Sequence, residues 1–272
     1  MTERELPPHE RITAALRRTT AAGHTALVPY ITAGYPHRDR FIATLRAIAQ
    51  EVDVVEVGVP FSDPMADGVT IQRASHAAIA SGVSLRWILA ELARAAPFAA
   101  PIVLMSYLNP LLSFGYEELA AAAIPAGVCG FIVPDLPIEE SADFRAALEA
   151  RGLALIQLVT PATPPERLAR LCAASRGFVY AVTTTGITGG GKELPASVGS
   201  YLDQVRSLSG LPVCAGFGVR RAEQVRSLAP HADGVIVGSA LVEQLESGGD
   251  PVAFLRALRA SVPVGAPSGA NF

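Results

Sequence analysis

The chain has 272 residues, of which 50% are hydrophobic and 17% are charged, and its formal net charge is −3. A chain of this size and composition can bury a large core, in one large domain or two small ones. Its charges are scattered, so no basic face can neutralise nucleic-acid phosphates, and no apolar run approaches the roughly 18 to 20 residues of a membrane span. We therefore expect a globular protein that binds neither nucleic acid nor a membrane.

The start of the chain, MTERELPPHERITAAL, carries acidic residues and lacks the apolar stretch of a signal peptide, which favours a cytoplasmic location. Cys129, Cys172 and Cys214 lie about forty residues apart in apolar surroundings, which is typical of buried thiols in a reducing compartment. The five histidines are dispersed, and no two have the spacing of metal ligands on a helix. We expect neither disulfides nor a metal site.

Short apolar, β-branched runs alternate along the chain with longer, alanine-rich amphipathic segments. Strands that lack polar alternation are covered on both faces, and helices between them supply the crossovers that parallel pairing requires. An extra helix is expected before the first strand, at 10–23, and a helical segment after the last strand, at 243–261. Eight strands are predicted, at 27–32, 54–59, 101–107, 130–136, 154–159, 178–182, 212–217 and 234–239.

Eight strand–helix units in a chain of this length predict a closed (β/α)8 TIM barrel, for which about 250 residues is typical. A doubly wound open sheet is the alternative. Against it, no G-x-G-x-x-G follows the first strand, and a helix still follows the eighth strand. We expect one barrel domain over residues 1–272, with the extra N-terminal helix covering its bottom. The tail at 262–272 is rich in Gly, Pro and Ala and should fray.

Glu56 lies inside the second predicted strand, among valines. An ionised carboxylate there would cost several kcal/mol unless it were paired or faced a cavity. It could be a structural glutamate bonded to a backbone group or a tyrosine. Because carboxylates are rarely buried without a reason, and because barrel enzymes work at the C-terminal ends of their strands, we favour a functional role.

The loop FSDPMADGV, which follows this strand, adds Asp63 and Asp67. Ser-Asp-Pro and Asp-Gly are also turn signatures, so either aspartate could hold the loop by bonding its own backbone. Asp67 also precedes a helix expected near Thr70 and could cap it. Asn109 and Asp135 lie beside prolines after the third and fourth strands, where a turn and a functional site are both possible.

Three glycine-rich segments predict a phosphate site. They are TTTGITGGGKELP after the sixth strand, GFGVR after the seventh, and GSA at the end of the eighth, where a helix follows. Glycines let backbone N–H groups approach an anion, and a helix N-terminus adds a favourable dipole. Each segment alone is typical of a tight turn, but barrels often build phosphate sites from the loops after strands seven and eight. Together on one rim, these segments favour phosphate binding.

Eight segments resemble, in order, the alpha subunit of tryptophan synthase: VPYITAGYP, EVGVPFSDPMADG, TIQ, MSYLNP, VPDLP, TTTGITG, AGFGV and GVIVGSALV. That family is a (β/α)8 barrel that cleaves indole-3-glycerol phosphate to indole and glyceraldehyde 3-phosphate in tryptophan biosynthesis. It then passes indole to a beta subunit that contains pyridoxal phosphate. The resemblance implies a lyase without a cofactor of its own, in an alpha2beta2 heterotetramer.

The resemblance also implies site residues. Glu56 matches the family's catalytic glutamate, which protonates indole C3 and then accepts the C3′ hydroxyl proton, while Asp67 matches a second carboxylate that stays ionised and bonds the indole N–H. Tyr180 matches a tyrosine near these carboxylates, and Tyr30 stands where an aromatic residue lines the indole pocket. The remaining substrate and phosphate contacts are expected at Thr188, in a loop that closes over Asp67, and at Gly189, Gly216, Gly218, Gly238 and Ser239.

Asp63, Asn109 and Pro137 match positions at which the family contacts its beta subunit. The segment TGGGK around Lys192 is unusually rich in glycine, so its ordering should depend on a partner. Lys192 is the only lysine, which disfavours barrel enzymes that use lysine as an acid. Two alternatives stay open: a stand-alone lyase that releases indole, and a barrel retained only as an allosteric partner.

Overall fold

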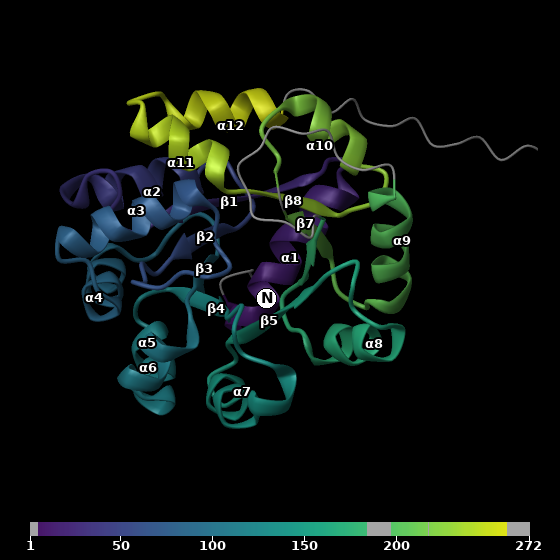
Figure 1. The fold of residues 1–272 in the computed structure, drawn as a ribbon, viewed down its shortest axis with the longest axis horizontal. Coiled ribbons are helices and arrows are strands. Elements are labelled where there is room, and N and C mark those ends of the chain that lie inside the picture. Colours follow the sequence, from purple (N-terminus) through teal and green to yellow (C-terminus); the bar gives the residue numbers. More distant parts are fainter. Residues whose placement is uncertain (1–4, 184–196, 217, 260–272) are drawn as a thin grey trace, which may run out of the picture.

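The computed structural model describes residues 5–183, 197–216 and 218–259 (Figure 1). Eight parallel strands form a closed barrel in chain order, and the eighth pairs with the first. This confirms the predicted (β/α)8 fold over the open sheet. The strands are β1 (Ala26–Thr32), β2 (Val55–Gly58), β3 (Ile102–Met105), β4 (Val128–Ile132), β5 (Ala154–Val159), β6 (Val179–Val182), β7 (Val213–Gly216) and β8 (Gly234–Val237).

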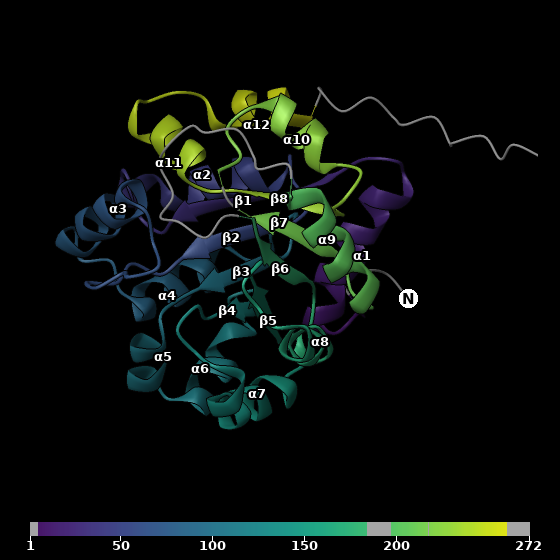
Figure 2. The same ribbon diagram turned by 45° about the vertical axis from the view of Figure 1, so that its right-hand side comes forward.

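Helices surround the barrel in the part of the chain that the structure describes (Figures 1 and 2). The α-helices are α1 (Pro8–Ala21), α2 (Phe41–Ala49), α3 (Val69–Ala80), α4 (Leu85–Ala95), α5 (Leu108–Phe114), α6 (Tyr116–Ala123), α7 (Ala142–Glu149), α8 (Pro165–Ala174), α9 (Val198–Leu208), α10 (Ala222–Leu228), α11 (Ser239–Glu246) and α12 (Pro251–Arg259). Two short 3-10 helices are η2 (Arg38–Arg40) and η3 (Ile138–Glu140).

Most predicted boundaries differ from the observed ones by no more than two residues, as for the strand expected at 101–107, which spans Ile102–Met105, but two were wrong by more. The strand expected at 130–136 runs from Val128 to Ile132 and ends two residues before Pro134, which has no backbone N–H to donate to a ladder. The last helical segment, expected at 243–261, contains the end of α11 and then α12. They are separated by a turn at Gly248, whose φ of +72° breaks a helix. The tail at 262–272 lies outside the described residues.

Along each strand, side chains alternate between an apolar layer against the surrounding helices and an apolar layer inside the barrel. In β2, Val55 and Val57 face the surrounding helices, while the preceding Val54 belongs to the cluster inside the barrel. Successive residues of a strand point to opposite faces of the sheet, so residues two apart, such as Val54 and Glu56, share a face. Glu56 therefore points into the barrel.

Helix α1 closes the N-terminal end of the barrel, as the sequence predicts. Ile12 and Leu16 of α1 are fully buried in the cluster inside the barrel. Phe178, the residue before β6, belongs to the same cluster. The Thr13 hydroxyl donates to the carbonyl of Gly177 at 2.8 Å, which fixes the helix beneath β6. With this end sealed, only the C-terminal ends of the strands give access to the interior.

Asp53, just before β2, joins three elements at the sealed end. Its buried carboxylate accepts hydrogen bonds from the backbone N–H of Leu27 at 2.8 Å and from the Thr19 hydroxyl at 2.5 Å. It also accepts from Arg259 of α12 at 2.6 Å. Removing this carboxylate would leave a buried donor on β1, and part-buried donors on α1 and α12, without this acceptor.

We predict that Asp53→Ala lowers the free energy of unfolding by about 3 kcal/mol, the usual cost of orphaning one side of a buried polar network. Urea denaturation measures it. Glu51→Ala is the matched control, because Glu51 also pairs with an arginine of α12, Arg256, but does so at the surface. A loss for Asp53→Ala no larger than that of the control would contradict the prediction.

Candidate active site

Glu56 lies on the inner face of β2, level with Tyr30 of β1 and Val103 of β3 in the strand register. The side chain is 1% exposed, and its Oε2 atom has no hydrogen-bond partner among the described residues. Glu56 therefore faces the barrel interior with an unsatisfied polar atom, so the structural alternative of a glutamate held by backbone or tyrosine lacks support for this oxygen.

Burial, together with a smaller effect of the nearby charge of Asp67, raises the pKa of Glu56 from its ordinary value of 4.5 to about 8. Desolvation penalises the charged form of a carboxyl group, and a second carboxylate repels it. Glu56 thus holds a proton at neutral pH, which removes most of the cost of its burial.

Asp67 lies in the loop between β2 and α3. Helix α3 begins at Val69 with Gly68 at the N-cap position, and no side chain caps it, so the capping role considered for Asp67 is wrong. Burial raises the pKa of Asp67 to about 6, against the effect of a hydrogen bond with Tyr107, which lowers it. Asp67 is therefore largely ionised at neutral pH, while Glu56 is protonated.

Tyr107, which lies between β3 and α5, is a site residue that the sequence did not single out. Its hydroxyl accepts a hydrogen bond from the backbone N–H of Ala66 at 2.8 Å and bonds the carboxylate of Asp67. Its ring stacks on Phe61, with 5.1 Å between ring centroids. Tyr107 thus holds the Asp67 loop at two points. It lies in MSYLNP, but an aromatic residue at a strand end is typical of core packing, so its type alone gave no signal.

Tyr30 and Tyr180 project into the barrel near Glu56. Burial raises the pKa of both hydroxyls well above the ordinary value, and the carboxylates of Glu56 and Asp67 add to this effect. Their rings occupy the space that side chains at Gly58 and Gly216 would fill. Gly216, predicted to contact substrate, is therefore required sterically, because Tyr180 lies directly against it.

The predicted phosphate residues that the structure describes lie after β7 and β8. Gly218 has a φ of +76° and open space around the position of a Cβ atom. Gly238 precedes α11, and the Oγ atom of Ser239, the first residue of that helix, is buried without a hydrogen-bond partner among the described residues. A helix N-terminus with an unsatisfied hydroxyl is suited to an anion. Thr188, Gly189 and Lys192 lie outside the described residues.

The three predicted partner contacts are exposed and follow successive strands: Asp63 after β2, Asn109 in the first turn of α5 after β3, and Pro137 after β4. Asp63 also accepts a hydrogen bond from the Ser62 hydroxyl at 2.6 Å, which stabilises its turn. Asp135 accepts from the backbone N–H of Leu108 at 2.9 Å and so caps α5 from the neighbouring loop, which supports the structural alternative for this residue.

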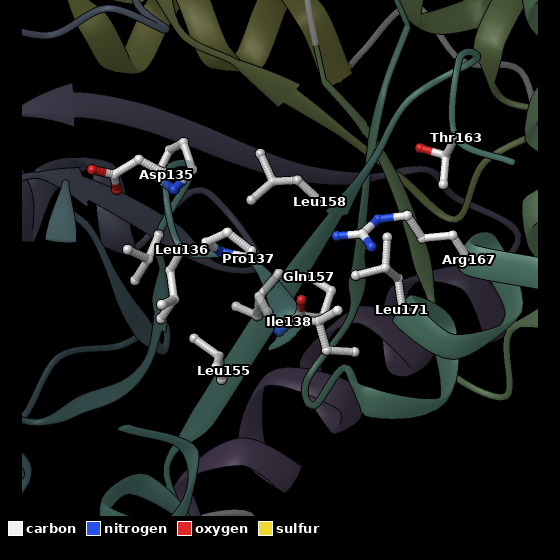
Figure 3. Close-up of a pocket in the computed structure, with 13 residues that line it drawn as sticks. Asp135, Leu136, Pro137, Ile138, Leu155, Gln157, Leu158, Thr163, Arg167 and Leu171 are labelled. Carbon is white, nitrogen blue, oxygen red and sulfur yellow. The ribbon is translucent and has the colours of Figure 1, made fainter. Parts of the chain in front are cut away.

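A cavity of about 310 Å³ lies between the segments that follow β4 and β5 (Figure 3). Arg167 of α8 reaches into it from one side, and Asp135 stands on the other, with apolar side chains between them. Arg167 forms a two-point ion pair with Glu139, at 2.7 and 3.0 Å, and Asp135 is engaged as a helix cap. Neither Glu56 nor Asp67 lines this cavity, so it is separate from the candidate active site.

Across residues 5–183, 197–216 and 218–259, no group of three or more His, Cys, Asp or Glu side chains is arranged to hold a metal ion. Cys129, Cys172 and Cys214 are buried. In the same ranges, no helix has the length and apolar character needed to cross a membrane.

Comparisons with known proteins point to one family. The family model of the tryptophan synthase alpha chain matches residues 16–260. The tryptophan synthase alpha chain of Nitratidesulfovibrio vulgaris strain DP4 is 46% identical over 249 residues, which are 91% of this chain and 97% of the relative. That of Roseiflexus castenholzii is 45% identical over 258 residues, with 92% and 99% covered. A solved structure of Mycobacterium tuberculosis tryptophan synthase superimposes with a TM-score of 0.87 at 39% identity, covering 94% of this chain and 99% of that one.

The raised pKa of Glu56 predicts how stability depends on pH. Between about 4.5 and 8 the native protein keeps a proton that the unfolded chain has released, so raising the pH favours unfolding. Glu56→Gln removes this titration. From pH 5 to pH 8, wild-type protein should lose about 3 kcal/mol of unfolding free energy relative to the variant. Urea denaturation at both pH values measures it, and a difference that stays constant with pH would contradict the assignment.

Proposed function

This chain belongs to the tryptophan synthase alpha chain family and carries out the alpha reaction of tryptophan biosynthesis, and we propose that Glu56 and Asp67 are its two catalytic carboxylates. The reaction is the carbon–carbon lyase step that cleaves indole-3-glycerol phosphate to indole and glyceraldehyde 3-phosphate. The observation that carries the assignment is the protonated Glu56 inside the barrel beside the more acidic Asp67.

The retro-aldol cleavage needs one proton delivered and one removed. Glu56 donates its proton to C3 of the indole ring, which turns the ring into an electron sink. The resulting carboxylate then accepts the proton of the C3′ hydroxyl as the bond between C3 and C3′ breaks. The electron pair of that bond returns to the ring and restores indole, and C3′ becomes the aldehyde carbon of the second product.

Asp67 stabilises the charge that develops on the ring. Its lower pKa, about 6, keeps it ionised while Glu56 is protonated, so its carboxylate can accept the indole N–H hydrogen bond as that nitrogen becomes positive. Tyr107 positions Asp67 through its hydrogen bond. The neutral rings of Tyr30 and Tyr180 form apolar walls for the indole.

We assign phosphate binding to the backbone N–H groups at Gly218 and Gly238 and to the hydroxyl of Ser239. The positive φ of Gly218, the start of α11 and the unsatisfied Oγ of Ser239 support this placement. Gly216 contributes by making room for Tyr180. Thr188 and Gly189 are assigned to loop closure and phosphate binding from the family resemblance alone.

We further propose that the whole chain forms one cytoplasmic barrel domain, needs no cofactor of its own, and works with a beta subunit that holds pyridoxal phosphate in an alpha2beta2 assembly. Asp63, Asn109 and Pro137 are the proposed contacts. Exposed apolar side chains of Met65 and Leu112 lie on the same loops and helix as two of these residues. Exposed apolar groups on the rim of the active site support a partner that covers this face.

Indole release from indole-3-glycerol phosphate by the purified protein tests the function. We predict that Glu56→Gln lowers kcat by at least about 100-fold, the usual contribution of general acid–base transfer, because the amide keeps the shape but cannot shuttle a proton. Glycerol 3-phosphate should bind the variant with unchanged affinity. Turnover within tenfold of wild type would refute the role of Glu56. No indole release by wild-type protein, alone or with a beta subunit, would leave only the allosteric alternative.

We predict that a cognate beta subunit raises kcat and that Leu112→Asp weakens this response. Leu112 of α5 is 52% exposed beside the proposed contact Asn109, so a charge there would oppose docking of an apolar partner surface. Leu208→Asp is the matched control, because Leu208 is 44% exposed at the end of α9, away from these contacts. Steady-state assays at increasing beta-subunit concentration measure both variants. Full activity alone, with no change on adding the partner, would instead indicate a stand-alone lyase.

A further inference from the structure

Helices α3 and α11 pack against each other outside β1 (Figures 1 and 2). Their seam is apolar: Ala74 of α3 and Val242 of α11 are buried in one small cluster with Tyr30 of β1, and Ile71 packs against it. Helix α3 follows the Asp67 loop, and α11 begins at the proposed phosphate site. The two ends of the active site are therefore carried by two helices that touch.

A polar contact stands beside this seam near the start of α3. The hydroxyl of Thr70, a buried residue, donates to Oε1 of Glu243 at 3.1 Å. One turn further along the seam, Arg73 forms a two-point ion pair with Glu246, at 2.9 and 2.5 Å. Thus α3 is joined to α11 twice, once through Glu243 in the middle of α11 and once through Glu246 at its C-terminal end.

Glu243 differs from Glu246 because it has a second partner on the phosphate side. Arg220, two residues after Gly218 in the loop that follows β7, forms an ion pair with the Glu243 carboxylate. The same loop is fixed from α10, where Gln224 donates to the carbonyl of Gly218 at 3.0 Å and accepts from the N–H of Arg220 at 2.7 Å. The loop that carries Gly218 is thus held to α11 by the ion pair between Arg220 and Glu243.

The start of α3 in turn holds the Asp67 loop. Gln72, two residues after Thr70, donates from its side chain to the carbonyl of Asp67 at 2.9 Å. Its backbone N–H donates to the carbonyl of Gly68 at 3.0 Å. Any shift of the first turn of α3 must therefore move the backbone of Asp67.

We propose that Glu243 is a positioning residue, an inference that rests on the proposed function. Its carboxylate links the loop after β7, through Arg220, to the first turn of α3, through Thr70. This link sets the position of Asp67. Its carboxylate bonds both segments, Arg220 on one side and Thr70 on the other. A charge-assisted bond on one side and a hydroxyl bond on the other fix its geometry. A misplacement of about 1 Å at the reacting groups can lower a rate about 100-fold, so a weak, half-buried link can matter for catalysis.

The test uses Thr70→Val, which keeps the shape of the side chain and removes only the hydroxyl, and Thr70→Ser, which restores it. We expect Thr70→Val to lower kcat for indole-3-glycerol phosphate about tenfold, with the affinity for glycerol 3-phosphate changed less than twofold. Thr70→Ser should recover most of the loss. Glu243→Gln should lower kcat and weaken glycerol 3-phosphate binding together, because it loosens Arg220 as well.

Two further measurements separate this role from a general loosening of the helix pair. Glu246→Gln breaks the other link between α3 and α11 without touching Arg220, and its kcat should stay within twofold of wild type. In the background of Glu243→Gln, adding Thr70→Val should cost less than twofold more, because the two residues act as one unit. Thermal unfolding identifies any variant whose loss reflects unfolding, and only variants that melt near wild type are compared.

Unchanged kcat in Thr70→Val, additive losses in the double variant, or an equal loss in Glu246→Gln would each overturn the proposal. These outcomes require that wild-type protein cleaves indole-3-glycerol phosphate. If it does not, the proposed function fails instead, so the two failures are distinguishable.

Discussion

The burial of one carboxyl group constrains the whole barrel. Glu56 points into an apolar interior, and it is tolerated there because burial shifts it to its neutral, protonated form. That shift depends on keeping water away from the interior. Helix α1 seals the N-terminal end with Ile12 and Leu16, and the valines that flank Glu56 in β2 fill the layer outside the strand. The elements that stabilise the fold therefore also create the acid.

A second constraint is the difference between the two carboxyl groups. Burial raises the pKa of both groups. Asp67 accepts a hydrogen bond from Tyr107, which favours its charged form, whereas the negative charge of Asp67 adds to the effect of burial on Glu56 and favours its neutral form. The charge of Asp67 thus helps to hold the proton on Glu56. Two titratable groups whose pKa values are pushed apart by their surroundings are what acid and base roles require. In this site, the two pKa values are separated by the deeper burial of Glu56 and by the hydrogen bond from Tyr107 to Asp67.

Sequence patterns predicted the barrel and drew attention to the carboxyl group of Glu56 because both follow from local rules. Runs of β-branched residues give strands covered on both faces, and a charged residue inside such a run stands out. Sequence patterns did not identify residues whose interaction partner is far away in the sequence. From sequence alone, Tyr107 is typical of an aromatic residue in the core, and only the fold shows that it bonds Asp67. Thr70 and Glu243 are separated by 173 positions, so no spacing pattern could connect them. The true end of β4 depends on where its pairing with β5 stops at Ile132, which propensity does not specify.

The order of strands explains why the two ends of the site meet over β1. Because the barrel is closed, β1 lies between β8 and β2, and the helices that follow these two strands must pack side by side on its outer surface. Tyr30, at the same level as Glu56, joins the cluster beneath them. The proposed phosphate site at the start of α11 and the carboxylate of Asp67 just before α3 are then separated by one strand and by the contact between the two helices. In this topology, communication between substrate binding and the acid–base pair needs no path through the barrel interior, since a single side chain such as Glu243 can span the seam.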